Sequence, residues 1–548
     1  MANWDRRGDE YRNRMEAARS LTTGKVVAPE RMVELLEAII RPQDKVCIEG
    51  DNQKQADFLA KALCQVNPER VHDLHMVQST IALPEHLDVF EKGIATKVDF
   101  AYSGPQSKRL AQMVQAGKVT LGAIHTYMEL YGRYFVDLTP QVALIVGFEA
   151  DRDGNLFTGG ATEDTPAIVE ATKFRKGIVV AEVNRIVDKV PRVDIPGDWV
   201  DFIVKSPEPF QMEALFTRDP AKISETRILK AMMALQLYKE YEVSTLNHGI
   251  GFDTAAIELL LPTYGNELGL KGKVCTNFIL NPHPTMIPVI EDGWVKSIHS
   301  PGTEVGMDAY VKARPDVFFV GPSGEMRTSR IFTQIGGQYA VDMFIGSTLQ
   351  IDQYGNSSTA TKSAIAGFGG APNIGSDAPG RRHASYGWLK CGEEWAGRKD
   401  AVGSVPRGRK LVVQLLDTVS EKGYPGFVDE LDAIQLWKKA NLEVPPIMIY
   451  GDDLTHIITE VGVAYLHKCA SLNERMAAIR AVAGDSPVGQ KENPEETAML
   501  RAKGIFRTPE DMGIDPARAK RSLLAAQSIA DLVAASGGLY QPPDKFLK

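Results

Sequence analysis

The sequence predicts an α/β protein with two related domains, and three observations lead to this fold class. Runs rich in valine and isoleucine alternate with segments whose apolar residues recur at helical spacing, which is typical of parallel-rich sheets flanked by helices. The motif D-x-x-G-N-x-x-T occurs twice, at residues 151–158 and 352–359. Each copy follows an apolar, strand-like run and precedes a basic cluster that opens another strand. Two distant copies exclude a solenoid and favour two domains that face one another across a ligand cleft.

The first predicted domain covers residues 26–223 and follows a charged helical arm at residues 1–25. Apolar residues at helical spacing predict helices at 30–40 and 55–63. Runs rich in valine and isoleucine predict strands that are buried on both faces. These strands are expected at residues 45–51, 70–77, 97–104, 141–150, 177–184 and 199–207.

The second predicted domain covers residues 224–450 and is joined to the first by residues 205–225, which carry three prolines and no periodicity. Ser224 is expected to cap a helix at 224–241. A strand, a glycine-rich turn and a helix then follow at 243–261, repeating the layout at the start of the first domain. Further strands are expected at 315–321, 347–352 and 410–417. Residues 451–548 are expected to form a helical extension of this domain, with helices at 454–470, 473–483 and 517–536.

The composition is that of an ordinary globular protein, with 24% charged and 44% apolar residues. The net charge of -8 disfavours a nucleic-acid partner. No apolar run approaches the roughly 18 residues that would cross a membrane, and residues 1–20 lack the apolar segment of a secretory signal. The five scattered cysteines include no C-x-x-C pair, so a cytoplasmic protein without a metal framework is expected.

The most unusual segment is 355–382, which holds six glycines and few large apolar side chains. Glycine is costly to order, so such a segment often exists because its backbone approaches a ligand closely. The N–H groups of Gly369, Gly370 and Ala371 could bind an anion or a developing oxyanion. The other interpretation is a mobile surface loop. Its place beside the second copy of the repeated motif favours a functional role.

These residues resemble the family I coenzyme A transferases, whose two halves share a related α/β fold. The family carries a G-x-G-G-A/Q-x-D/N loop, which is matched here by residues 367–373, and a D-x-x-G turn before it, matched by residues 352–355. Within this group the sequence is most similar to the alpha subunits of bacterial malonate decarboxylase, from about Leu21 to the C-terminus. Four blocks carry this likeness: residues 281–295, 313–321, 346–361 and 367–385.

The resemblance implies an acyl-carrier-protein transferase that exchanges acetyl-S-carrier and malonate for malonyl-S-carrier and acetate. It implies an acyl carrier protein and malonyl-carrier decarboxylase subunits as partners. The thioester would be carried on phosphoribosyl-dephospho-coenzyme A or coenzyme A, as a substrate, with no cofactor bound by this chain. Neither nucleic acid nor a membrane is expected as a partner.

One departure from the wider family concerns its nucleophile. Those transferases use a glutamate shortly after the first strand of the second half, and Thr276 or Asn277 is expected in its place here. Neither side chain can form an acyl-glutamyl anhydride. The malonate carboxylate is then expected to attack the acetyl thioester directly, and the released thiolate to attack the mixed anhydride.

The candidate site residues fall into three groups. Gly370, Ala371, Thr276 and Asn277 are expected to take part in catalysis. Arg327 and Arg330, with His283 and Gly104, are candidates for binding the acid, and Arg381 and Arg382 are further cations. Gly249, Gly251, Gly367, Gly369 and Asn356 are candidates for holding the thioester arm. Each has a structural interpretation too: ion pairs for the arginines, loop packing for His283, a strand-end cap for Asn277, and tight turns for the glycines.

Two other classes of function stay open from the sequence. One is a coenzyme A transferase or a citrate lyase alpha subunit that acts on another carboxylic acid. The other is a ligand-sensing subunit without catalysis, because related α/β folds serve in both roles.

Overall fold

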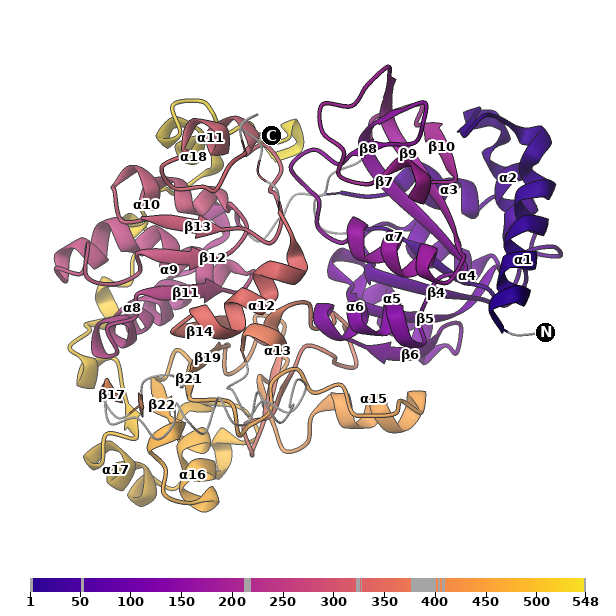
Figure 1. The fold of residues 1–548 in the computed structure, drawn as a ribbon. Helices are drawn as coiled ribbons and strands as arrows, with labels where there is room; N and C mark the ends of the chain where they lie inside the picture. Colours follow the sequence, from indigo (N-terminus) through magenta and orange to yellow (C-terminus); the bar gives the residue numbers. More distant parts are fainter. Residues whose placement is uncertain are drawn as a thin grey trace.

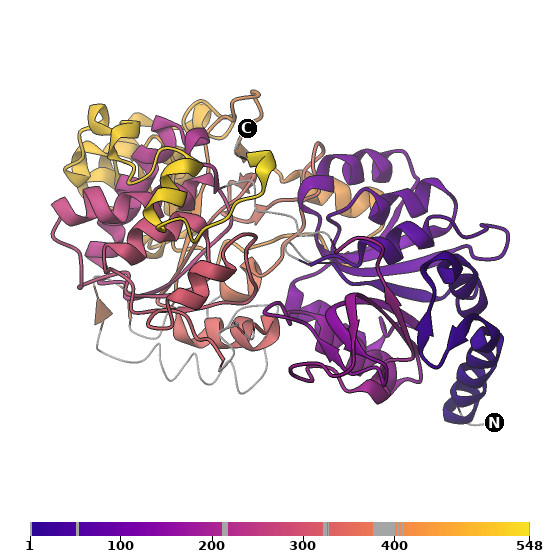
Figure 2. The same cartoon turned by 90° about the horizontal axis from the view of Figure 1, so that it is seen from above.

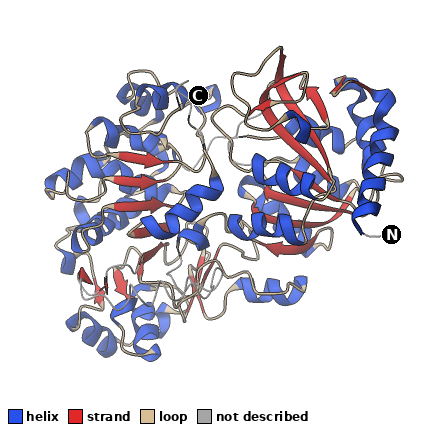
Figure 3. Ribbon diagram, in the orientation of Figure 1, coloured by secondary structure: helices blue, strands red, loops and turns tan. Residues whose placement is uncertain are grey.

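The computed structural model describes residues 3–50, 54–210, 218–321, 326, 328–375, 401–402, 405–406 and 410–546. Two α/β lobes lie side by side, with the N-terminus at the outer end of the first lobe (Figures 1 and 2). Helices cover the sheet of each lobe (Figure 3). The expected α/β architecture, with parallel-rich sheets flanked by helices, is therefore confirmed.

The first domain is built on a ten-stranded sheet in the order β1-β2-β10-β9-β7-β3-β4-β5-β6, with β8 paired to β7. Its pairs are parallel except β1 with β2 and β7 with β8. The strands are β1 (Thr22–Thr23), β2 (Val26–Val27), β3 (Lys45–Ile48), β4 (Leu74–Thr80), β5 (Ala95–Tyr102), β6 (Thr120–Ile124), β7 (Val142–Asp151), β8 (Leu156–Phe157), β9 (Ile178–Val187) and β10 (Phe202–Lys205). The helices are α1 (Asn3–Ala18), α2 (Met32–Ile39), α3 (Asp57–Leu63), α4 (Glu85–Glu91), α5 (Ser107–Gln115), α6 (Tyr127–Val136) and α7 (Thr165–Phe174).

The alternation of side chains along the strands explains why this sheet is covered on both faces. Leu144 on β7 belongs to the core beneath α2 to α5, whereas its neighbour Ile145 belongs to the core beneath α6 and α7. Both are fully buried. A strand buried on both faces must be apolar at successive positions, which is the pattern that predicted it. The predicted N-terminal arm is the helix α1, which packs on α2 and is held by the buried ion pair of Arg14 with Asp44.

The second domain contains an eight-stranded sheet in the order β13-β12-β11-β14-β19-β21-β22-β23, and small sheets formed by β16-β15-β20 and β17-β18. Its strands are β11 (Thr245–His248), β12 (Asn277–Ile279), β13 (Ser297–His299), β14 (Met343–Ser347), β15 (Gln350–Asp352), β16 (Ser357–Ser358), β17 (Ala401–Val402), β18 (Val405–Pro406), β19 (Leu411–Leu415), β20 (Phe427–Val428), β21 (His456–Ile458), β22 (Val463–Tyr465) and β23 (Phe506–Arg507). Its helices are α8 (Glu225–Glu240), α9 (Phe252–Leu260), α10 (Ile287–Glu291), α11 (Asp308–Ala313), α12 (Arg330–Ala340), α13 (Ala371–Ile374), α15 (Asp432–Ala440), α16 (Leu472–Val482), α17 (Pro494–Ala502) and α18 (Ile529–Ala535).

Part of the C-terminal region differs from the expected helical extension. The helix predicted at 454–470 is wrong, because this segment forms β21 and β22, which complete the second sheet beside β19. Its β-branched residues favour strands, and Gly462 lies in the connection between them. The helix predicted at 473–483 is confirmed as α16, whereas 517–536 holds only α18 after two short 3₁₀ turns. The strand predicted at 315–321 forms only isolated bridges.

The repeated motif forms the same turn in both domains. In the first copy, Asp151 accepts hydrogen bonds from the backbone N–H groups of residues 153 and 155, at 3.1 and 3.0 Å. Asp352 accepts from the N–H groups of residues 354 and 356, both at 2.9 Å. The asparagine of each copy also donates its amide to the aspartate of the motif. The motif therefore closes the β7–β8 and β15–β16 hairpins, and its role in both copies is structural.

The connection between the domains is described at its two ends, and residues 211–217 lie outside the described part. Ser224 caps α8 by accepting from the N–H of Arg227, as the sequence predicts. Among the described residues, no helix combines the length and the apolar composition that crossing a membrane requires.

Candidate active site

A cavity of about 210 Å³ lies between the two domains. The first domain contributes Tyr102 at the end of β5 and Tyr127 at the start of α6. The second domain contributes residues at or after the carboxyl ends of its strands, the edge at which open α/β sheets bind ligands. The second-domain residues used below are Gly249, Leu280, Asn281, His283, Arg330, Gln334 and residues 366–371.

The glycine-rich loop crosses from the second domain to the sheet edge of the first. The N–H groups of Phe368 and Gly369 both donate to the carbonyl oxygen of Ala101, at 2.7 and 3.0 Å. The N–H of Ser103 donates back to the carbonyl of Ala366 at 2.9 Å. Gly367 has a φ of +77°, and an added Cβ would lie 2.9 Å from the Cα of Tyr102. Glycine is required here because the two backbones touch and the backbone is left-handed.

These contacts reduce the predicted group of three oxyanion donors. The N–H of Gly369 is occupied by Ala101, and the N–H of Ala371 donates to Phe368 at 3.4 Å. Gly370 lines the cavity, and its N–H donates to no other group among the described residues. Gly370 packs against Gln334 of α12, whose Oε1 would lie 2.8 Å from a Cβ at this position. Of the three predicted donors, Gly370 is therefore the one whose N–H has no partner among the described residues and stays available to a ligand.

Arg330, the first residue of α12, brings a buried positive charge to the cavity. Its side chain forms an ion pair with Glu163 of the first domain, and its Nε lies 3.6 Å from Asp164. Its guanidinium lies over the ring of Tyr127, at 4.3 Å from the centroid. Burial opposes the charge, but Asp164 and Glu163 outweigh it and raise the pKa of Arg330 well above its ordinary value.

One nitrogen of Arg330 is left for a ligand. Its Nη1 is buried and has no hydrogen-bond partner among the described residues, although burying a donor without a partner costs roughly 1–3 kcal/mol. A carboxylate in the cavity would satisfy this donor. Burial raises the pKa of the neighbouring Tyr127 to about 12, so its hydroxyl stays neutral at physiological pH.

The sequence profile described as malonate decarboxylase, alpha subunit, transporter matches residues 3–548. The chain belongs to this family. It is 61% identical over 546 residues to the acetyl-S-ACP:malonate ACP transferase of Malonomonas rubra, with 99% of each chain covered. The resemblance stated from the sequence is thereby confirmed.

Solved structures of malonate decarboxylase agree with this assignment. The chain matches one in a Pseudomonas malonate decarboxylase hetero-tetramer in complex with malonate, with 54% identity, a TM-score of 0.92, and 100% and 99% of the two chains covered. It matches the alpha subunit from Acinetobacter baumannii with 54% identity, a TM-score of 0.91, and 99% and 100% covered. A citrate lyase alpha subunit from Streptococcus mutans shares the fold at 14% identity and a TM-score of 0.58, over 87% of this chain and 86% of that one.

The structure corrects the predicted place of Thr276 and Asn277 in this family member. Both lie at the amino end of β12, where Asn277 donates to Thr276 and accepts from Ser297. The cavity lies at the other end of the strand and is lined there by Leu280 and Asn281. Thr276 and Asn277 therefore do not line this cavity, and the length of so short a strand is not apparent from its composition. No aspartate or glutamate among the described residues lines the cavity.

Three other candidates do not line the cavity. Gly104 packs against the ring of Tyr102, and Gly251 lies beside Ser347. Asn356 donates to Asp352 and accepts from the N–H of Gly451, so its amide is engaged in the hairpin turn. Its predicted contact with the thioester arm is corrected to a structural role. Arg327, Arg381 and Arg382 lie outside the described residues.

His283 and Gly249 do line the cavity, yet their polar atoms face the protein. Arg218 lies 3.3 Å from Nε2 of His283, so Nε2 accepts and Nδ1 carries the proton toward Glu258, at 3.4 Å. Burial, followed by the charge of Arg218, lowers the pKa of His283 to about 4, so the ring is neutral at physiological pH. The packing interpretation of His283 is therefore favoured over donation to the substrate.

Sequence reasoning missed Tyr102, Tyr127, Gln334 and Asn281. Tyr102 lies within the strand predicted at 97–104, and Asn281 opens one of the blocks that carry the family resemblance, so both had a signal in the sequence. Tyr127 and Gln334 had none, because their place in the cavity depends on how the two domains meet.

Proposed function

We propose that this chain is a transferase that exchanges acetyl-S-carrier and malonate for malonyl-S-carrier and acetate. The observation that carries the proposal is the cavity between the domains, which combines an unpartnered buried arginine nitrogen with an available glycine N–H. The relative from Malonomonas rubra is named for this exchange, and the solved Pseudomonas complex holds malonate. A citrate lyase-like activity is less well supported, because that likeness shows the fold alone.

The reaction proceeds in two acyl transfers without an enzyme nucleophile. A malonate carboxylate oxygen attacks the acetyl carbonyl of the thioester, the C–S bond breaks, and the products are an acetyl–malonyl anhydride and the carrier thiolate. The thiolate then attacks the malonyl carbonyl of the anhydride, and acetate leaves with the bridging oxygen. Both nucleophiles are already anions, so no general base is needed, which suits a cavity whose described lining contains no carboxylate.

The protein's contribution is alignment and charge stabilisation. Through its Nη1, Arg330 binds the malonate carboxylate that does not react. The ring of Tyr127 packs against the guanidinium of Arg330. The N–H of Gly370 donates to the oxyanion of each tetrahedral intermediate, worth roughly 3 kcal/mol. Alignment of carboxylate and thioester supplies an effective molarity of about 10⁵ M or more.

The proposal includes the partners of the exchange. The thioester is presented by an acyl carrier protein on a phosphoribosyl-dephospho-coenzyme A arm, or by coenzyme A, as substrate. Malonyl-carrier decarboxylase subunits then consume the product, and this chain itself binds no cofactor. The hetero-tetrameric state of the Pseudomonas relative supports a role within a multi-subunit complex.

A single-turnover experiment tests the reaction. Purified chain is mixed with an acetyl thioester and labelled malonate, quenched, and treated with hydroxylamine or borohydride. Labelled malonyl thioester and free acetate are expected, with no acyl group trapped on the protein. A chemically competent glutamyl adduct would overturn the direct route, and ligand binding without turnover would favour a sensor.

A further inference from the structure

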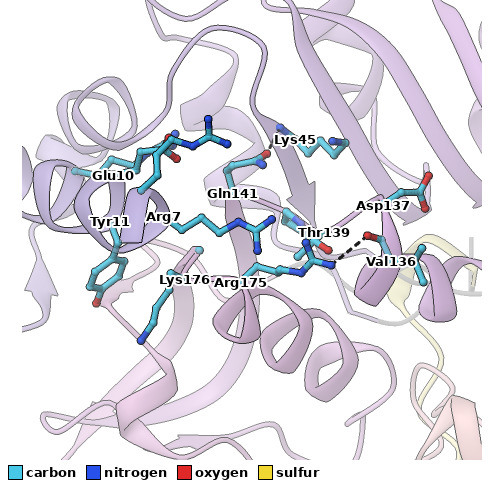
Figure 4. A pocket seen from close by; sticks show the side chains of 14 residues that line it. Arg7, Glu10, Tyr11, Lys45, Val136, Asp137, Thr139, Gln141, Arg175 and Lys176 are labelled. Atoms are coloured by element: carbon cyan, nitrogen blue, oxygen red, sulfur yellow. Dashed lines mark hydrogen bonds and ion pairs between the residues drawn. The ribbon is translucent and has the colours of Figure 1, made fainter. Parts of the chain in front are cut away.

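A second cavity, of about 250 Å³, lies beneath α1 at the outer end of the first domain (Figure 4). Lys45 opens β3, Gln141 precedes β7 and Gly177 precedes β9, so the cavity is at the amino ends of these parallel strands. The cavity between the domains lies at the opposite edge, where Tyr102 ends β5. An eight-residue strand such as β5 spans about 25 Å. This second cavity is therefore not part of the acyl-transfer site.

The charge of this cavity is opposite to that of the whole chain. Six basic and two acidic residues line it: Arg6, Arg7, Arg14, Lys45, Arg175 and Lys176, with Glu10 and Asp137. The chain as a whole carries a net charge of -8. The basic cluster that follows the first repeated motif supplies Arg175 and Lys176, and the function proposed above does not use it.

The two acidic residues already have partners. Glu10 faces Arg6 at 3.9 Å, and Asp137 accepts from Arg133 at 2.9 Å. Arg7 is half-buried and makes no hydrogen bond or ion pair within the described part of the chain. Arg175 is half-buried as well, and among the described residues it donates only to the carbonyl groups of Phe135 and Val136, at 3.3 and 3.4 Å.

The two arginines converge in the cavity. Figure 4 shows the side chains of Arg7 and Arg175 both pointing toward Thr139. Two half-buried guanidinium groups repel one another unless an anion lies between them. Guanidinium groups pair with carboxylates in bidentate geometry, so a carboxylate suits this position.

Exposed apolar side chains lie on the same segments as the lining residues Val136 and Arg175. Val136 and Phe174 are 69% and 64% exposed, and Phe135 is 37% exposed. Val136 lines the cavity, and Phe174 directly precedes Arg175. A small inorganic anion would contact only the cations, whereas a polypeptide would also cover these apolar side chains. Apolar patches of this kind mark protein-binding surfaces.

We propose that this cavity, with Val136 and Phe174, forms a docking surface for an acidic segment of another polypeptide of the complex. One or two carboxylate side chains of the partner enter between Arg7 and Arg175, and an apolar side chain covers Val136 and Phe174. The inference rests on the proposed role within a complex, but not on the chemistry of the exchange. The proposed contact lies at the amino ends of the strands, so a bound partner leaves the active-site cavity at their carboxyl ends open.

A binding experiment with matched charge reversals tests the docking surface. The full chain is titrated against the remaining subunits of the complex, prepared without it, at low and high salt. R7E/R175E is expected to weaken binding at least tenfold. The control R12E/R19E makes the same change in net charge at exposed positions outside the cavity, and should stay within about twofold of wild type. R7Q, which leaves the hydrogen bonds of Arg175 in place, gives a second test if the double reversal does not fold.

Equal affinity of R7E/R175E and wild type would overturn the proposal, as would equal losses in the two double variants. Phosphate and citrate serve as small-anion probes in a thermal unfolding assay. If they stabilise wild type but not R7E/R175E while the subunits bind both alike, the cavity takes a free anion and no partner. Exchange with a soluble acetyl thioester, measured on the same samples, reports separately on the proposed function.

Discussion

Replacing Arg330 by glutamine tests the assignment of the malonate site. The change removes the one cationic side chain that lines the described cavity, and with it the buried Nη1 that has no hydrogen-bond partner among the described residues. A charge-assisted hydrogen bond contributes about 1.5 to 3 kcal/mol. Because each 1.4 kcal/mol is a factor of ten, the half-saturating malonate concentration should rise roughly 10- to 100-fold.

The same substitution also affects stability, and this effect must be separated from binding. It leaves Glu163 and Asp164 buried without their cation, and breaking a buried ion pair costs about 3–5 kcal/mol. Asp164 keeps the hydroxyl donors of Ser79 and Tyr131, so Glu163 carries most of the loss. The double variant R330Q/E163Q should therefore recover much of the melting temperature while its malonate affinity stays low.

The assay is acetyl–malonate exchange at varied malonate concentration, repeated with the monomethyl ester of malonate. Wild type should prefer the dianion, and R330Q should lose most of that preference because the carboxylate that does not react has no cation to bind. If R330Q is folded and its half-saturating malonate concentration stays within twofold of wild type, Arg330 does not bind the substrate.

Three further predictions concern single sites. Gly370→Val should lower turnover about 100-fold with little change in melting temperature, because the added side chain displaces Gln334 and disturbs the oxyanion donor. The control Gly336→Ala, on the open face of α12, should leave turnover unchanged. Gly367→Ala should lower the melting temperature much more than Gly423→Ala does. Both glycines have φ near +80°, but only Gly367 touches another backbone segment. Equal losses of melting temperature in the two variants would show that backbone strain alone matters. Burial lowers the pKa of His86 from 6.5 to about 4. The stabilisation from the buried neutral ring is therefore complete above pH 6.5 and is lost as the pH falls toward 4. Between pH 7.5 and 5 the free energy of unfolding should fall by about 2 kcal/mol from this group. The melting temperature of His86→Gln should therefore fall less than that of wild type between pH 7.5 and 5. If the two proteins show parallel pH profiles of melting temperature, His86 is not the source of this pH dependence.

The strand β7 and the segment 454–470 show why some elements were predicted correctly and others were not. β7 was predicted because residues 142–148 are successively apolar and rich in valine and isoleucine, which favours a strand covered on both faces. The segment 454–470 failed because short apolar runs occur in helices and in buried strands alike. Its place beside β19 is a long-range pairing that no local pattern shows.

The candidate site, too, was predicted only in part. The glycine-rich loop stood out by composition, and Gly367, Gly369, Gly370 and Ala371 all line the cavity. Thr276 and Asn277 do not line the cavity, because they lie at the amino end of a strand of three residues and the cavity lies at its carboxyl end. The repeated motif, the most conspicuous local pattern, proved to be a hairpin turn. Its aspartate accepts from backbone N–H groups of the turn, and its asparagine donates to that aspartate.

By itself the amino-acid sequence determined that two α/β halves form, where their glycine-rich backbone lies, and to which family the chain is similar. Each of these depends on local periodicity or on residues that are contiguous in the chain. Only the tertiary structure decided that Ala101 occupies the N–H groups of Phe368 and Gly369, which leaves Gly370 available, and that Glu163 holds Arg330 at the cavity. These contacts join residues of different domains, so they exist only once the two lobes have met.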